Sequence, residues 1–246
     1  YVFVNADEEV GSFESGRWLR RLAPLMSRCL VAEPSLGPEG LLKTARKGVA
    51  SYTVTITGRP AHAGLDPENG ASAILALSYL IQQLHSLNSA EKGVSVNVGL
   101  VQGGLRANVV APESRAVIDV RVPSQQAIEE VEAAIYSLQP QVPGVSWTLS
   151  GGLGRPPLER NPRNQALWRR ADELGQLLGL SLQQGIAGGG SDGSTTSLYS
   201  PTLDGLGPVG GGAHSQDEFV WLASLPERSA LLAMLLLEEE SNVDAR

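Results

Sequence analysis

Four stretches in the middle of the chain alternate between apolar and polar residues, and stretches of helical periodicity lie among them. In SYTVTIT, residues 51–57, Tyr52, Val54 and Ile56 fall on one face and the threonines on the other, as in a half-buried strand. The element order predicted by this pattern is β-α-β-β-α-β. The expected strands lie near 51–57, 94–100, 116–122 and 145–149, and the expected helices at 71–87 and 125–138.

This order is that of a ferredoxin-like α/β sandwich, which is a complete small domain. The segments TARKG and SGGLGRPP on either side of it have a hinge-like composition. We therefore expect residues 48–154 to be an inserted domain. Residues 1–47 and 155–246 are expected to form one outer α/β domain with a mostly parallel sheet and covering helices. Its expected elements are strands at 1–4 and 28–32 and helices at 12–26, at 163–180 and from about Pro226.

Composition narrows the function classes. The 246 residues are 42% hydrophobic and carry a net charge of -7 without a Lys/Arg block, so no nucleic-acid footprint is present. The apolar run 231–237 is too short to span a bilayer and is expected to be the buried flank of a helix. Cys29 is the single cysteine, which excludes an intrachain disulfide and a thiolate zinc site. Because the chain opens with Tyr1 inside an apolar run, we expect a fragment or a processed chain, with a cytoplasmic location favoured.

The segment DEEVGS places three acids where the first apolar run ends. Adjacent carboxylates repel one another unless one is neutral or a cation lies between them. Of two consecutive side chains such as Glu8 and Glu9, one can bind a metal while the other handles the proton of a metal-bound water. The alternative is a solvated acidic turn before a helix, with Ser12 as the N-cap.

Two other segments favour the metal hypothesis. Glu33 of VAEP follows the next apolar strand, and ligands of open α/β sheets bind at such strand ends. His214 of GGGAHSQDEF lies in a loop outside any apolar period, whereas His85 falls on the polar edge of a helix. Glutamates and a histidine without thiolates are typical ligands of a catalytic zinc ion. The sequence contains no HExxH motif, which excludes a zincin.

The segment GGGSDGSTTS is the second glycine-rich signal. Its backbone N–H groups could hold an anion at a helix N-terminus. Without a GK[ST] or a GxGxxG motif, nucleotide binding is a weak hypothesis, and a substrate carboxylate is a better fit. The same residues are equally typical of a tight loop followed by a capped helix.

In this order, DEEVGS, AEP, TGRPAHAG, GGGSDGSTTS and GAHSQDE resemble the zinc-dependent exopeptidase and deacylase family of carboxypeptidase G, acetylornithine deacetylase and succinyl-diaminopimelate desuccinylase. The resemblance covers essentially the whole chain, with the greatest similarity to the carboxypeptidase G (glutamate carboxypeptidase) branch. It implies a di-zinc catalytic domain in the outer pieces. It also implies that the inserted domain is a lid through which two copies dimerise.

The resemblance assigns roles to the acids and to one histidine. Glu8 matches the general base that takes a proton from the zinc-bound water. Glu9 and His214 match ligands of one zinc ion, and Glu33 matches a ligand of the other. Asp7 matches the leading acid of the motif, without a defined role.

The resemblance also assigns residues that contact substrate. His62 matches a histidine that enters the partner subunit's active site and stabilises the oxyanion. Asn108 and Arg121 match residues that hold the substrate's terminal carboxylate, for which the planar guanidinium of arginine is suited. From the residues alone, His62 is a loop histidine and Arg121 the partner of an acid across the sheet. The segment 188–192 matches the loop beside the substrate, and its candidate binding residues are Gly189, Gly190 and Ser191.

The chain departs from the family pattern upstream of DEEVGS. The family's HxD motif and bridging aspartate precede this segment, and only seven residues precede Glu8. A catalytic zinc ion normally has three protein ligands. We therefore expect this chain alone to bind zinc weakly, singly or not at all, to lack peptide hydrolysis and to expose apolar surface.

The function expected by resemblance is that of a zinc-dependent carboxypeptidase that releases a C-terminal amino acid such as glutamate. Two alternatives stay open. One is an N-acyl amino-acid deacylase of the acetylornithine or succinyl-diaminopimelate type. The other is a catalytically inactive dimerisation or binding module. A phosphate-binding enzyme that uses the glycine loop is a distant further alternative.

Overall fold

The computed structural model describes residues 1–238, and the chain forms two compact units. One unit is Gly48–Gly154, and the other is Tyr1–Lys47 together with the chain from Arg155 onward. These bounds coincide with the predicted bounds of the inserted and outer domains. Each unit has a hydrophobic core of its own.

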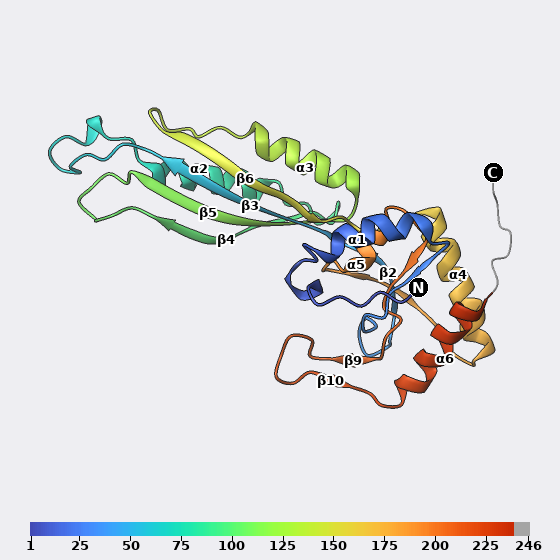
Figure 1. The fold of residues 1–246 in the computed structure, drawn as a ribbon. Coiled ribbons are helices and arrows are strands. Elements are labelled where there is room, and N and C mark those ends of the chain that lie inside the picture. The colour runs from blue at the N-terminus through green and yellow to red at the C-terminus, as the bar shows by residue number, and fades with distance from the viewer. Residues whose placement is uncertain (239–246) are drawn as a thin grey trace. The chain divides into compact units, whose positions relative to one another are not determined.

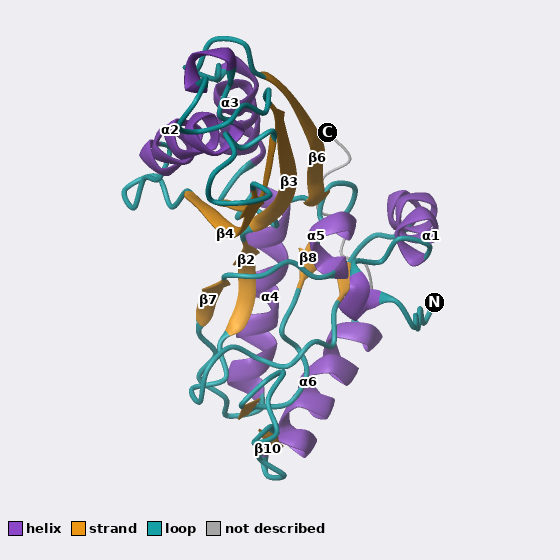
Figure 2. Cartoon of the chain, turned by 90° about the vertical axis from the view of Figure 1, so that its left-hand side faces the viewer, coloured by secondary structure: helices purple, strands orange, loops and turns teal. Residues whose placement is uncertain are grey.

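The inserted unit is a four-stranded sheet with two helices on one face (Figures 1 and 2). The strand order is β4-β5-β3-β6, and both β3 and β4 run antiparallel to β5. Both helices share one core with the inward faces of β3 and β5, whereas most of β4 is exposed. The chain order is the predicted β-α-β-β-α-β, with β3 (Gly48–Thr57), α2 (Ala73–Ser86), β4 (Ser95–Gly103), β5 (Glu113–Val122), α3 (Gln125–Ser137) and β6 (Ser146–Arg155). The short 3-10 helix η3 (Pro67–Asn69) lies in the loop after β3.

Local sequence signals explain these elements. The alternation in β3 buries Tyr52, Val54 and Ile56 completely, while the threonines between them stay partly exposed. Each helix begins at a serine whose hydroxyl accepts a hydrogen bond from a first-turn N–H group. Ser72 accepts from the Leu75 N–H at 3.2 Å, and Ser124 accepts from the Ala127 N–H at 3.1 Å. These caps satisfy N–H groups that have no partner within the helix.

The outer unit contains short strands and longer helices. Two pairs, β1 with β8 and β2 with β7, are parallel, and β9 with β10 forms an antiparallel hairpin. The apolar faces of α4 and α6 pack against Leu42 of β2 and Leu203 of β8. The elements are η1 (Glu8–Val10), α1 (Ser15–Leu22), η2 (Ala23–Leu25), β1 (Cys29–Leu30), β2 (Leu42–Arg46), α4 (Pro162–Leu177), β7 (Gln184–Ala187), α5 (Asp192–Thr196), β8 (Thr202–Leu203), β9 (Gly210–Gly211), β10 (Phe219–Val220) and α6 (Ser224–Leu237).

The predicted first strand is wrong. Residues 1–4 form no strand, and the side chains of Tyr1, Val2 and Val4 are exposed. An apolar run becomes a strand only beside a second strand, and no strand within residues 1–238 pairs with this one. Phe13, at 77% exposure, and Leu25, at 74%, extend the apolar surface of this region. Such exposed apolar surface is what the sequence predicts for the outer unit.

The apolar run 231–237 is the end of α6. Leu231 and Leu235 are fully buried, but Leu236 is 64% and Leu237 83% exposed, so the expected buried flank is buried on one side only. Among residues 1–238, the helices are all too short or too polar to cross a membrane.

The core of the inserted unit gives a stability prediction. Leu80 of α2 is 1% exposed, so Leu80→Ala should lower the free energy of unfolding by roughly 2–5 kcal/mol through lost burial and a cavity. Leu75→Ala on the same helix, where the side chain is 47% exposed, should change it by less than about 1 kcal/mol. Hydrogen exchange of the β3 and β5 amides measures both. Equal losses for the two variants would contradict the assignment of this core.

Candidate active site

The acidic segment before α1 is a tight turn in which Asp7 has a structural role. The Asp7 carboxylate accepts hydrogen bonds from the N–H groups of Glu14, at 2.9 Å, and Ser15, at 3.2 Å. A hydrogen bond from the Ser15 side chain contributes most to lowering the pKa of Asp7, and these backbone bonds lower it further. The turn thus places a carboxylate on N–H groups at the start of α1, but the N-cap residue is Glu14, whose own side chain makes no capping bond, and not Ser12.

Glu8 is held by an arginine that the sequence did not single out. Nη2 of Arg155 lies 2.9 Å from Oε1 of Glu8, and it also donates to the Glu8 carbonyl oxygen and to Oγ of Ser12. Both charged side chains are largely buried, at 13% and 23% exposure. Burial raises the pKa of Glu8, the charge of Arg155 lowers it, and the neighbouring carboxylates of Glu33, Asp192 and Glu9 raise it further.

Asp192 joins the glycine-rich segment to the acidic turn. Its carboxylate accepts hydrogen bonds from Nδ2 of Asn5 at 2.6 Å, Oγ of Ser12 at 2.5 Å and Nη1 of Arg155 at 3.4 Å. Residues from the two ends of the chain thus form one polar network around Glu8. Two of the motifs noted in the sequence, DEEVGS and GGGSDG, meet in it.

The glycine-rich loop is fixed by a buried ion pair. Arg46 donates from Nε and Nη2 to the two carboxylate oxygens of Asp204, at 2.7 and 3.2 Å, and its Nη1 donates to the carbonyl oxygens of Gly189 and Gly190. Ser191 is 1% exposed and donates its hydroxyl to Asp204 at 2.5 Å while capping α5. The Ser191 side chain is therefore occupied in the interior as part of a capped tight loop, and a substrate contact by this residue stays a prediction.

Glu9 and His214 come together from opposite ends of the chain. Nε2 of His214 lies 3.3 Å from Oε2 of Glu9, and both side chains are well exposed, at 80% and 78%. His214 sits in the loop between β9 and β10 with a left-handed φ of 63°. The sequence predicted this pairing by resemblance.

Glu33 follows β1 and is half-buried, with its backbone carbonyl accepting from the Gly207 N–H at 2.9 Å. The charge of the Glu33 carboxylate raises the pKa of Glu8. However, no group of three His, Cys, Asp or Glu side chains within residues 1–238 has the geometry of a metal site. The oxygen and nitrogen donors of Glu9 and His214 suit zinc, and two donors are fewer than the three a catalytic zinc ion needs. The described residues thus fit part of such a site.

His62 lies in the exposed loop between β3 and α2 of the inserted unit. Its Nδ1 accepts hydrogen bonds from the N–H groups of Gly64, at 3.1 Å, and Leu65, at 3.2 Å. Asp66 accepts from the His62 N–H at 3.0 Å and braces the same loop. With Nδ1 used as an acceptor, the neutral imidazole carries its proton on Nε2, which is left as a donor.

Asn108 and Arg121 lie at opposite ends of β5. Asn108 precedes the strand in an exposed loop that pairs with the His62 loop, and its carbonyl accepts from the Ala63 N–H at 3.0 Å. At roughly 3.3 Å per residue, the backbone between Glu113 and Arg121 spans about 26 Å. Within one chain the two predicted carboxylate-binding residues are therefore too far apart to hold one carboxylate.

The Arg121 guanidinium is occupied in this structure. It forms a two-point ion pair with Asp119, with N···O distances of 2.8 and 2.9 Å. The acid lies two residues earlier on the same strand, on the same face of the sheet, and not across the sheet as the residue pattern alone had suggested.

The arginines that organise the outer unit carry few signals in the sequence. Arg155 is the only charged residue in the hinge-like segment SGGLGRPP, and Arg46 lies in the other such segment, TARKG. A lone arginine in a glycine-rich segment was the available signal for Arg155. Its carboxylate partners could not be identified because they come from distant parts of the chain.

Comparison with known proteins connects this architecture to a family. The model of the peptidase dimerisation domain matches residues 44–140, which is most of the inserted unit. Carboxypeptidase G2 of Pseudomonas sp. (strain RS-16) is 28% identical over 96% of this chain and 58% of its own length. Succinyl-diaminopimelate desuccinylase of Thioalkalivibrio sulfidiphilus is 23% identical over 96% of this chain and 65% of its own length. The chain thus spans less than two thirds of either relative.

Solved structures share the fold. Aminopeptidase PepT from Bacillus cereus has a TM-score of 0.74 and 20% identity over 91% of this chain and 61% of that one. A tripeptidase from Staphylococcus aureus has a TM-score of 0.72 and 22% identity over 93% of this chain and 61% of that one. The inserted unit thus matches the peptidase dimerisation domain, and the chain is similar along nearly its whole length to carboxypeptidase G2 and to succinyl-diaminopimelate desuccinylase.

Proposed function

We propose that this chain supplies part of the active site of a metal-dependent carboxypeptidase, which cleaves the amide bond before a C-terminal amino acid such as glutamate. The observation that carries the proposal is the meeting of Glu9 and His214 at 3.3 Å, close in sequence to the largely buried carboxylate of Glu8. Similarity to these relatives supports the reaction class, and the name of carboxypeptidase G2 supports the choice of a carboxypeptidase.

Glu9 and His214 would hold one zinc ion, and Glu33 would help to hold a second in a complete site. A bound zinc ion supplies Lewis acidity and lowers the pKa of its water. With two converging donors in residues 1–238, weak binding of at most one ion is the expectation for this chain.

Glu8 would serve as the base that receives the proton of the attacking water. Burial raises the pKa of this carboxyl, which suits proton transfer near neutral pH, while Arg155 favours its ionised form. The same arginine fixes the carboxylate in one direction through the 2.9 Å ion pair. Arg155 is thus a positioning residue for the base.

His62, Asn108 and Arg121 would contact the substrate, and their separation within one chain supports a division between two copies. His62 and Asn108 are neighbours at one end of the inserted unit. Arg121 pairs with Val49, next to the point where the chain passes from Lys47 of the outer unit into β3. One substrate would therefore meet Arg121 of one copy and His62 and Asn108 of the other, with Nε2–H of His62 donating to the oxyanion.

The surface for dimerisation would be the edge strand β4 and the exposed side of α2. Leu100 and Val101 of β4 are 66% and 56% exposed, and the edge has unpaired backbone groups. Ile74 of α2 lies beside Gly103 at the end of this strand and is 47% exposed. An apolar edge of this kind suits a second copy of the same strand.

A non-catalytic dimerisation module is the second candidate, favoured by the small number of converging metal donors. A deacylase of the desuccinylase type would use the same base and metal residues, so no residue described above separates it from a carboxypeptidase. Metal stoichiometry separates the catalytic proposal from the module.

The first prediction here concerns the metal. Calorimetric titration of this chain with Zn²⁺ should give weak binding of at most one ion. His214→Ala and Glu9→Gln should each weaken it at least about tenfold. His85→Ala, which removes an exposed histidine of α2, is the matched control and should change nothing. Equal binding by the wild type and His214→Ala, or tight uptake of two ions, would contradict this assignment.

The second concerns the base. In the complete gene product, Glu8→Gln should lower kcat on an N-acyl-L-glutamate by about 10²–10⁴-fold without changing zinc content. Glu14→Gln removes an exposed carboxylate six residues later and should leave kcat unaffected. A Glu8→Gln enzyme with wild-type kcat would rule out Glu8 as the base.

The third concerns the dimer. Leu100→Lys places a charge on the β4 edge and should raise the dimer dissociation constant at least about tenfold. Leu177→Lys, at a 76% exposed site on α4, is the control and should leave it unchanged. Sedimentation velocity over a concentration series measures both. A monomeric wild type, or equal dissociation constants for the two variants, would refute the proposed interface.

A further inference from the structure

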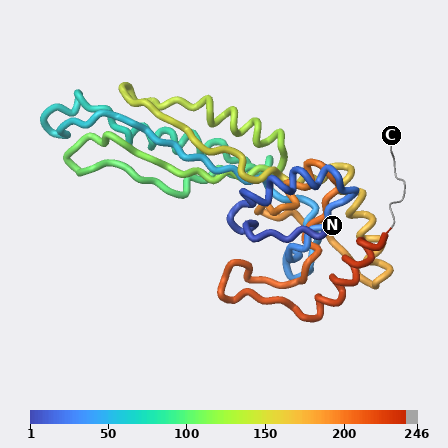
Figure 3. The backbone as a smooth tube through the Cα atoms, in the orientation of Figure 1, coloured from blue at the N-terminus to red at the C-terminus, as the bar shows by residue number. Residues whose placement is uncertain are grey.

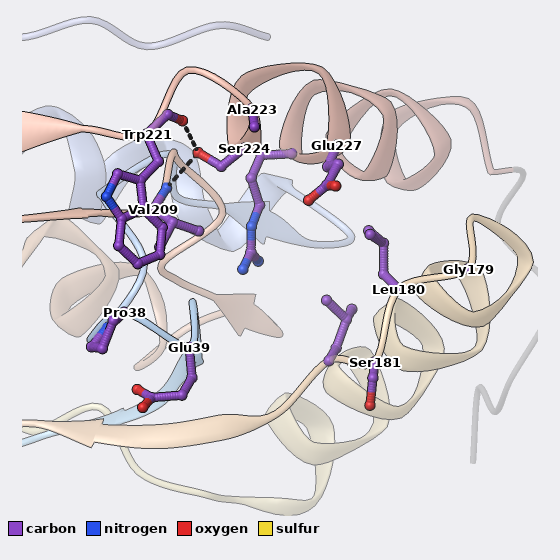
Figure 4. A pocket seen from close by; sticks show the side chains of 12 residues that line it. Pro38, Glu39, Gly179, Leu180, Ser181, Val209, Trp221, Ala223, Ser224 and Glu227 are labelled. Carbon is purple, nitrogen blue, oxygen red and sulfur yellow. Dashed lines mark hydrogen bonds between the residues drawn. The ribbon is translucent and has the colours of Figure 1, made fainter.

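A cavity of about 350 Å³ lies in the outer unit, away from the residues assigned to the reaction. It opens to solvent on one side and is lined mainly by the loop after β1, the loop after α4 and the chain from β10 into α6 (Figure 4). Its size is in the range of pockets that hold small molecules. Figure 4 shows Glu39, Leu180 and Trp221 around a common space, one from each part of this lining, with Glu227 on the same segment as Trp221.

Arg228 of α6 lines the cavity, and only some of the hydrogen-bond donors of its guanidinium have partners. The residue is 8% exposed, its Nη2 donates to the carbonyl oxygen of Gly40, and its buried Nη1 has no hydrogen-bond partner among the described residues. Gly40 has a left-handed φ of 66°, and a Cβ atom there would collide with this guanidinium. Burial lowers the pKa of Arg228, and Glu227 opposes that effect.

An unpartnered donor on a buried cation is costly. Nη1 is inaccessible in this conformation, so a ligand carboxylate in the cavity would satisfy it only once the guanidinium has rotated toward the ligand.

The remaining lining defines the rest of the ligand. Trp221, Leu180 and Val209 provide apolar walls, and Pro38 and Leu182 extend them. Glu39 and Glu227 place two carboxylates at the exposed rim, so the charges around the cavity disfavour a phosphate or another anion without a positive group. The lining matches a molecule with a carboxylate, an ammonium group and an apolar body.

The cavity lies at the base of the hairpin that carries His214. Val209 and Trp221 flank β9 and β10, and the Trp221 N–H donates to the Val209 carbonyl at 2.9 Å. Ser224 joins both, accepting from the Val209 N–H at 2.9 Å and donating to the Trp221 carbonyl at 2.7 Å. Figure 3 shows this part of the chain, in orange, running out and back as one long hairpin. A change at its base can therefore be carried along paired backbone to the loop of His214.

We propose that this cavity binds a free amino acid with an apolar or aromatic side chain, and that its occupancy is transmitted along the hairpin to His214. The carboxylate pairs with Arg228, the ammonium group faces Glu39 and Glu227, and the side chain packs on Trp221. The proposed transmission to His214 rests on the proposed function, because the reaction proposed there releases an amino acid. The binding itself is independent of that function.

Calorimetry of the 246-residue chain with L-phenylalanine, in the absence of metal, tests the binding. One molecule should bind per chain, and L-phenylalaninamide and N-acetyl-L-phenylalanine, which lack the carboxylate or the ammonium group, should bind at least about tenfold more weakly. Inorganic phosphate should neither bind nor compete. Absence of binding, or equal affinity for all three organic molecules, overturns the proposal.

Variants locate the site. Arg228→Met should weaken L-phenylalanine binding at least about tenfold. Arg163→Met is the matched control, because Arg163 also donates to backbone carbonyls of its own unit, those of Ser197, Leu198 and Tyr199. It should bind as the wild type does. Leu180→Trp, which fills the cavity without touching Arg228, should abolish binding and replaces Arg228→Met if that variant does not fold. Undiminished binding by Leu180→Trp overturns the site.

The transmission has its own measurement. The chain has three histidines, so NMR signals of their imidazoles are readily assigned with His214→Ala. L-phenylalanine should shift the His214 signals and leave those of His62 and His85 in place. Binding without a His214 shift overturns the transmission. Loss of the zinc response with intact amino-acid binding would instead refute the proposed function and leave this site standing.

Discussion

The ion pair between Arg46 and Asp204 is the interaction on which the outer unit depends. Both side chains are buried, and the pair links the last residue of β2 to the segment after β8. Through the same groups it holds the glycine-rich loop and the serine that caps α5. Removing one partner of such a pair leaves an uncompensated buried charge, at a cost of roughly 3–5 kcal/mol. The position of Asp192 beside the acidic turn follows from this arrangement.

The inserted unit was largely predictable because its signals are local. Strict alternation in β3 and β5 and serine caps before α2 and α3 decide those elements within a few residues. The outer unit was less predictable from the sequence. Its strands β2 and β7, with the sequences LKTAR and QGIA, are short, carry no alternation of their own and exist because they pair with each other across 140 positions of chain. Conversely, YVFV had the composition of a strand but lacks a partner within residues 1–238.

The candidate site shows the same contrast between local and long-range signals. Residue chemistry singled out Glu8, Glu9 and His214, and resemblance assigned them a common site. The groups that position them were missed, because the partners of Arg155 come from both ends of the chain. For Ser191 the sequence left two roles open, because a serine after glycines serves equally as a ligand or as a cap, and the structure shows the buried cap.

His214 adopts a backbone conformation that ordinarily belongs to glycine. Holding a residue with a Cβ atom there costs roughly 1–2 kcal/mol, and the preceding residues 210–212 are all glycine. A loop so rich in the residue best suited to this backbone nevertheless carries an imidazole at its tip. Histidine is among the residues that adopt this conformation more readily than most, and at this position its imidazole lies beside the Glu9 carboxylate.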